Sequence, residues 1–203
     1  RLVGSEMCIR DRRKIEVGKG KLNLQEHQLN DWIKEVGSDF ADEDEGLIEY
    51  DFDPQIGKVP FDKDKCWTIL SNLLINALKH TPQGKIITVR TRLTTDRQHV
   101  RVSISDQGSG LKDIDPNKLF TRFYQGNNEQ SGSGIGLSYA KILVELHNGQ
   151  IGACNNPDEG ATFYFELPLK QVQTDSTPEH QSSYLNELLS SFSAQDIDVP
   201  NRT

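Results

Sequence analysis

Residues 62–81 are predicted to form a long helix whose apolar surface is interrupted by a polar stripe. Asp62 can cap the N–H groups of the first turn, and Thr81-Pro82-Gln83-Gly84 ends the helix. Spacings of three and four bring four polar side chains onto neighbouring positions: Asn72, Asn76, Lys79 and His80. The side chains that can face a sheet lie opposite, at Ile69, Leu70, Leu73, Leu74 and Ala77.

The two asparagines of this stripe indicate more than a solvated helix face. A solvated face would be the default reading for Lys79 and His80 alone, but Asn72 and Asn76 interrupt an apolar run, where an unpaired amide is costly. Amide oxygens are hard, neutral ligands that suit a Mg²⁺ ion shared with phosphate oxygens. Lys79 can hold a phosphate as a point charge.

The segments around this helix predict a sheet. A helix is expected near residues 29–36, strands at 47–52, 87–93 and 100–104, a helix at 135–146, and a closing hairpin of 150–154 with 161–167. This order predicts an α+β fold, a two-layer α/β sandwich with helices packed on one face of the sheet.

Asp106-Gln107-Gly108-Ser109-Gly110 directly follows one of these strands. Alternation places Asp106 on the core face with Val100, Val102 and Ile104, so its carboxylate needs a donor. An exocyclic amine of a ligand is one candidate, whereas an ordinary turn is the commoner meaning of this motif alone.

Ser131-Gly132-Ser133-Gly134-Ile135-Gly136-Leu137 opens the last helix. Free N–H groups at a helix start suit a phosphate chain, and a flexible hinge is the alternative. The motif is neither a Walker A loop nor a dinucleotide fingerprint, because the required spacing is absent.

Charge and composition limit the partners. The chain has 203 residues with a net charge of −7, which argues against a nucleic-acid surface. It contains no apolar run long enough to cross a bilayer, so no direct membrane contact is expected. Three scattered cysteines allow no disulfide framework and favour a reducing cytoplasm.

The ends of the chain differ from its middle. Residues 1–21 are basic and begin with a stretch that resembles a translated adaptor sequence, and residues 171–203 form a polar linker or tail. An acidic stretch at 39–53 is expected to be a solvated loop rather than a calcium site, since Leu47 and Ile48 follow Gly46. The folded domain is predicted at residues 22–170.

The motifs occur in the order of the N, G1, F and G2 boxes of the sensor histidine kinase ATP-binding domain, whose Bergerat fold is shared with gyrase-type ATPases, Hsp90 and MutL. The resemblance covers roughly residues 22–170, which is most of the chain, and rests on four segments: 72–76, 106–110, 120–124 and 132–137. Four ordered boxes are far more restrictive than any single motif.

The resemblance implies ATP and Mg²⁺ as cofactors and assigns roles. By this resemblance, Asn76 coordinates Mg²⁺, and Asn72 and Lys79 approach the phosphates. His80, at a position where the family often has Tyr, lies beside the adenine and the ribose. Asp106 accepts a hydrogen bond from the adenine amino group. The remaining positions shape the pocket and lid: Gly108, Gly110, Gly132, Gly134, Ile135, Gly136 and Leu137.

The same resemblance implies a histidine protein kinase fragment. The ATPase relatives carry a Glu at the position of Asn72, and an amide cannot act as a general base, so hydrolysis is disfavoured. No segment resembles the acceptor-histidine helix, and neither His27 nor His180 has its context. The fragment is therefore expected to bind ATP without phosphorylating itself. The expected partners are a histidine-containing dimerisation domain and a response regulator or receiver domain.

Two other functions stay open: a non-catalytic nucleotide-sensing module of the same fold, and an ATPase or anti-sigma-type serine kinase. Phe120 and Phe123 can either latch a lid or pack in the core, and Arg122 can contact phosphates, a partner domain or solvent. Thr162 is the candidate hydroxyl for adenine support, but alternation points it away from Phe163 and Phe165.

Overall fold

Five strands form one mixed sheet. The computed structural model describes residues 22–40, 47–112, 114–121 and 135–170. The strand order is β2-β4-β5-β7-β6, in which β2 and β4 are parallel and the other neighbours antiparallel. The strands are β2 (Leu47–Phe52), β4 (Ile86–Leu93), β5 (His99–Ser105), β6 (Gln150–Asn155) and β7 (Ala161–Pro168).

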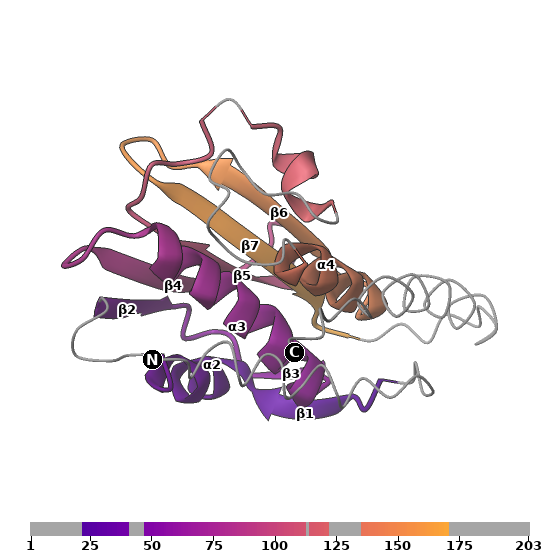
Figure 1. The fold of residues 1–203 in the computed structure, drawn as a ribbon. Helices are drawn as coiled ribbons and strands as arrows, with labels where there is room; N and C mark the ends of the chain where they lie inside the picture. Colours follow the sequence, from indigo (N-terminus) through magenta and orange to yellow (C-terminus); the bar gives the residue numbers. More distant parts are fainter. Residues whose placement is uncertain (1–21, 41–46, 113, 122–134, 171–203) are drawn as a thin grey trace, which may run out of the picture. The chain divides into compact units, whose positions relative to one another are not determined.

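Helices cover one face of this sheet. Figure 1 shows α3 and α4 side by side across it, with α2 beside α3 at the β2 end. The helices are α2 (Leu29–Ser38), α3 (Lys63–His80) and α4 (Gly136–Leu146), and a short 3₁₀ helix, η1, spans Pro116–Phe120. The prediction of an α+β sandwich with helices on one face is confirmed.

The core lies between the sheet and these helices. Helix α3 buries the five apolar side chains predicted to face the sheet, and β7 contributes Phe163 and Phe165. The predicted alternation also holds in β4 and β5, where the fully buried residues are Ile87, Val89, Thr91, Val100, Val102 and Ile104. Burial of this continuous apolar layer is the main force that holds the helices on the sheet.

A two-stranded ribbon was not predicted from the sequence. Strand β1 (Gln25–Gln28) pairs antiparallel with β3 (Lys58–Phe61). Pro60 and Phe61 therefore belong to a strand, and the long helix begins only after Asp62. Phe61 is fully buried and packs its ring against Trp32, with ring centroids 4.9 Å apart.

Asp62 caps α3 as expected and also holds the N-terminal segment. Its Oδ1 accepts the Lys65 N–H at 3.1 Å, while its Oδ2 accepts the Asn23 N–H at 2.9 Å and the Lys65 ammonium at 2.8 Å. Burial alone would raise the pKa of Asp62, but these donors outweigh it and lower that pKa. One carboxylate thus joins Asn23, which precedes β1, to the start of α3.

The described residues fall within one compact unit, Leu22–Gln171. The predicted leader at residues 1–21 and the predicted tail at 171–203 lie outside the described residues, as do residues 41–46 of the acidic stretch. Residues 47–52 of that stretch belong to β2 and not to a solvated loop. None of the helices in the described ranges has the length and apolar composition needed to cross a bilayer.

Candidate nucleotide site

The polar stripe of α3 lies where the sequence predicts it. Asn72 and Asn76 are half-buried, whereas Lys79 and His80 are exposed at the end of the helix. Neither asparagine side chain makes a hydrogen bond to any residue in the described ranges, although each carries two donors and an acceptor oxygen. Two amides in an apolar helix are therefore available to a polar ligand.

Asp106 is the buried acid of the site. Its side chain is 2% exposed, one residue beyond the end of β5, on the core face predicted from alternation. Oδ1 accepts the Gly108 N–H at 2.9 Å and the Ala161 N–H at 3.1 Å. Oδ2 has no hydrogen-bond partner among the described residues. Since an unpaired buried carboxylate oxygen is costly, this atom is suited to a donor on a ligand.

Two glycines allow the loop after β5 and the start of α4 to lie close to α3. A Cβ built on Gly108 would collide with the backbone carbonyl oxygen of His80, so the loop after β5 lies against the end of α3. A Cβ built on Gly136 would lie 2.9 Å from Oδ1 of Asn72, so the start of α4 lies against the middle of α3. The structure therefore brings Asn72, His80 and the Asp106 loop into one region.

Charge and burial affect the two basic groups at the end of α3. Partial burial of the exposed Lys79 side chain lowers the pKa of its ammonium group. Burial and the neighbouring Lys79 charge lower the pKa of His80, and the Asp106 carboxylate only partly offsets them. His80 is therefore neutral at pH 7 and presents a flat, uncharged ring.

The start of α4 is only partly described. Ile135 occupies the N-cap position without a side-chain cap, so the first N–H groups of α4 are not satisfied by that residue. Leu137 is half-buried and packs against the core. Gly132 and Gly134 lie outside the described residues. Gly110 has a φ of 69°, which supports the glycine requirement at this position.

Two open questions from the sequence are answered by packing. Phe120 is 7% exposed, with its ring centroid 6.4 Å from that of Phe163, so it is a core residue. Phe123 and Arg122 lie outside the described residues. Thr162 is on the face opposite the helices, as alternation predicts, and its hydroxyl donates to Oδ1 of Asn156 at 2.6 Å. The Thr162 hydroxyl is therefore bonded to the Asn156 side chain.

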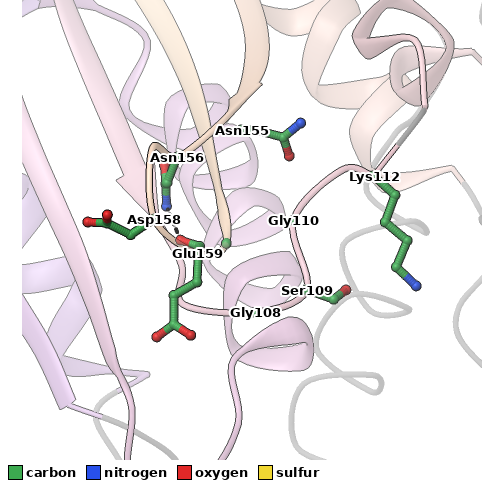
Figure 2. Close-up of a pocket in the computed structure, with 9 residues that line it drawn as sticks. Gly108, Ser109, Gly110, Lys112, Asn155, Asn156, Asp158 and Glu159 are labelled. Atoms are coloured by element: carbon green, nitrogen blue, oxygen red, sulfur yellow. Dashed lines mark hydrogen bonds between the residues drawn. The ribbon is translucent and has the colours of Figure 1, made fainter.

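Sequence reasoning missed two asparagines, one at the end of β6 and one in the β6–β7 turn, that hold the Asp106 loop. Asn155 accepts the Leu111 N–H at 2.7 Å, and Asn156 donates to the Asp106 carbonyl oxygen at 2.9 Å. Both asparagines line a pocket of about 370 Å³ along this loop, and Figure 2 shows them among its lining residues. The motif Asn-Asn-Pro-Asp indicates a turn, and no local signal reveals a partner some 50 residues away.

The described residues contain no cluster of three or more His, Cys, Asp or Glu side chains that could hold a metal ion. A metal at this site would therefore depend on other oxygens, such as amides and ligand phosphates, the usual arrangement for Mg²⁺. Asn76 offers such an oxygen.

A known protein family covers this part of the chain. A family model described as histidine kinase-, DNA gyrase B- and HSP90-like ATPase matches residues 61–171, which is more than half of the chain. The chain belongs to this family. The matched range contains the α3 stripe, Asp106 and the start of α4.

Several of the similar curated proteins are named as histidine kinases or sensory kinases. Histidine kinase P4 of Formosa agariphila is 30% identical over 200 residues, which cover 94% of this chain and 14% of that protein. Sensor histidine kinase WalK of Bacillus subtilis is 34% identical over 125 residues, covering 60% of this chain and 20% of that protein. The chain thus spans a minor part of these relatives.

Solved structures give the same fold. The catalytic domain of histidine kinase ThkA is 25% identical with a TM-score of 0.65, covering 72% of this chain and 96% of that one. Full-length ShkA in complex with AMPPNP has a TM-score of 0.66 at 24% identity, covering 76% of this chain and 33% of that one. The family match, the curated sensor kinases and the likeness to the ThkA catalytic domain together identify the chain as the ATP-binding catalytic domain of a two-component sensor histidine kinase.

Proposed function

We propose that this domain binds Mg·ATP between α3, the loop after β5 and the start of α4, and presents the γ-phosphoryl group to a histidine on a separate dimerisation domain. The observation that carries the proposal is the Asp106 carboxylate, which is 2% exposed with one oxygen bonded twice and the other unpaired among the described residues. An adenine amino group supplies the missing donor.

The phosphate end of the site uses the α3 stripe. Asn76 would hold Mg²⁺ through its amide oxygen, and Asn72 and Lys79 would face the phosphates. The first N–H groups of α4, which the Ile135 side chain does not cap, would add donors. When bound, Mg²⁺ neutralises charge on the phosphate oxygens. The neutral ring of His80 lies beside the base, and Gly108 and Gly136 keep the walls close enough to enclose the ligand.

Transfer to a histidine is favoured over hydrolysis because Asn72 cannot take a proton from water. Phosphoryl transfer requires that the reacting groups are positioned and that the phosphate charge is neutralised, and the residues of α3 can contribute to both. The acceptor histidine belongs to a dimerisation domain, and the phosphoryl group then passes to a response regulator. In the parent kinase this domain faces the cytoplasm, where ATP is available.

Titration calorimetry with Mg·ATP tests the proposed base contact. The Asp106→Asn variant replaces the acceptor oxygen or presents an amide donor, and we expect it to lose detectable binding while its melting temperature stays near that of the parent chain. The matched control is Asp31→Asn, an exposed carboxylate in the first turn of α2, which should bind normally. Unchanged affinity of Asp106→Asn would contradict the adenine assignment.

A transfer assay separates the remaining candidate functions. The chain is incubated with γ-labelled ATP and a purified histidine-bearing dimerisation domain. Acid-labile label on that domain supports the proposal, release of free phosphate supports an ATPase, and acid-stable label supports a serine kinase. Nucleotide binding without transfer to any acceptor tested would favour a sensing module.

A further inference from the structure

Asp106 departs from the regular ladder between β5 and β7. Its N–H donates to the Ala161 carbonyl oxygen at 2.9 Å, as an antiparallel pair requires. The reciprocal N–H of Ala161 goes instead to Oδ1 of the Asp106 side chain, at 3.1 Å. In a regular ladder that N–H would bond the Asp106 carbonyl oxygen, so this carbonyl needs another donor.

Asn156 supplies that donor. Its Nδ2 lies 2.9 Å from the Asp106 carbonyl oxygen and 3.1 Å from the Glu159 carbonyl oxygen. Figure 2 shows the Asn156 amide directed into its own turn, with the dashed bond to Glu159. One side chain therefore closes the β6–β7 turn and holds the backbone of the buried acid.

The orientation of this amide is fixed by two hydroxyl groups. Thr162 donates its proton to Oδ1 of Asn156 at 2.6 Å, which leaves the NH₂ end of the amide facing Asp106. Since the Thr162 proton is used, Ser105, whose Oγ lies 2.6 Å from Oγ1 of Thr162, must donate to Thr162. The chain of bonds runs from Ser105 through Thr162 and Asn156 to Asp106.

We propose that Asn156 is a positioning residue for adenine recognition. Because its amide bonds to the Asp106 carbonyl oxygen, the Ala161 N–H is free to bond to Oδ1 of the Asp106 carboxylate. This arrangement directs the other carboxylate oxygen, Oδ2, toward the 6-amino group of the base. This inference rests on the proposed function, because it assumes that the base contacts Asp106. Thr162 acts one step further away, by keeping the donor end of the amide toward Asp106.

The test compares ATP with inosine triphosphate, which carries an oxo group in place of the 6-amino group. Dissociation constants are measured by calorimetry with Mg²⁺ for the parent chain, Asn156→Ala and Thr162→Val. We expect Asn156→Ala to reduce the preference for ATP about threefold to tenfold, the usual effect of one hydrogen bond. A general loss of folded protein would weaken both nucleotides equally, so the ratio isolates the positioning role.

The matched control acts on the same turn without touching Asp106. Lys85 pairs with Glu159 at 2.6 Å, and Lys85→Gln breaks this exposed ion pair, so the nucleotide preference should not change. If Asn156→Ala does not fold, Thr162→Val decides, and it should lower the preference in the same direction. An unchanged ratio in the folded variants would overturn the inference.

The same series separates this inference from the proposed function. If the parent chain does not prefer ATP and Asp106→Asn binds as well as the parent, the adenine assignment itself is wrong. If Asp106→Asn loses ATP but Asn156→Ala keeps the full preference, only the positioning role is wrong.

Discussion

His147 Nε2 accepts the backbone N–H of Asp62 at 3.2 Å, which joins the end of α4 to the N-cap of α3. The imidazole is fully buried, and its Nδ1 lies 2.7 Å from the Leu143 carbonyl oxygen. Nδ1 therefore donates and Nε2 accepts, which is the pattern of a neutral ring. Protonation of Nε2 would place a second donor against the Asp62 N–H.

The folded domain should lose stability in mild acid through His147. Burial lowers the pKa of His147, and its hydrogen bond to Leu143 and the Asp62 charge only partly offset this. The unfolded chain, with a His pKa of about 6.5, thus binds the proton more readily. The contribution of His147 is complete above that pH and is lost as pH falls toward the lower folded pKa.

Urea unfolding at two pH values, about 7.5 and about 5.5, on either side of the ordinary His pKa, measures this effect. We expect the free energy of unfolding to fall more in the parent chain than in His147→Gln, which stays neutral. Burial and Lys79 also lower the pKa of His80, but His80 is present in both proteins and cancels in the difference. Equal pH dependence in the two proteins would argue against the neutral ring.

Gly108→Ala should damage both the fold and the site. The new methyl group meets the backbone carbonyl oxygen of His80, which cannot rotate away as a side chain can. We expect a loss of about 1–3 kcal/mol in the free energy of unfolding, the usual cost of overpacking, together with weaker Mg·ATP binding. Gly57→Ala is the control, because nothing lies within 4 Å of the position that its methyl group would take, and it should leave both quantities near the parent values.

Gly136→Ala should separate binding from stability. The methyl group would lie 2.9 Å from the end of the Asn72 side chain, which can turn aside, so melting should stay close to that of the parent chain. The displaced amide should weaken Mg·ATP binding. In the Asn72→Ala background the same glycine substitution should have no further effect on affinity, and an additive loss in the double variant would refute the contact.

Asn76→Ala should remove most of the Mg²⁺ dependence of nucleotide binding. The amide oxygen is the proposed metal ligand, so calorimetry with and without Mg²⁺ should show a much smaller difference than in the parent chain. Binding of ATP in the presence of EDTA serves as the internal control and should be unaffected. A Mg²⁺ titration identical to that of the parent would remove Asn76 from the proposed site.

Local patterns were sufficient for much of the fold. The Asp62 cap, the buried face of α3 and the core position of Asp106 all follow from helical spacing or strand alternation, which act over a few residues. The ribbon of β1 and β3 did not follow, because Gln25–Gln28 is polar and becomes a strand only by pairing with a distant segment.

In the candidate site, too, some positions follow from local motifs and others depend on contacts between distant residues. The positions of Asn72, Asn76 and Asp106 follow from motifs, and their roles stay predictions. The role proposed for Asn156 has no local signature, because it depends on a carbonyl group 50 residues earlier that the ladder leaves without its usual donor. For Phe120 both a lid and a core were consistent with the sequence, and only the contact with Phe163 decides between them.

Helix α3 connects the segment that precedes β1 to the polar stripe of the proposed site. Its 18 residues form a rod about 27 Å long. One end is fixed by Asp62 to Asn23, the residue that leads into β1, and the polar stripe occupies the other half. A displacement at Asn23 therefore acts on the same continuous helix that carries Asn72 and Asn76.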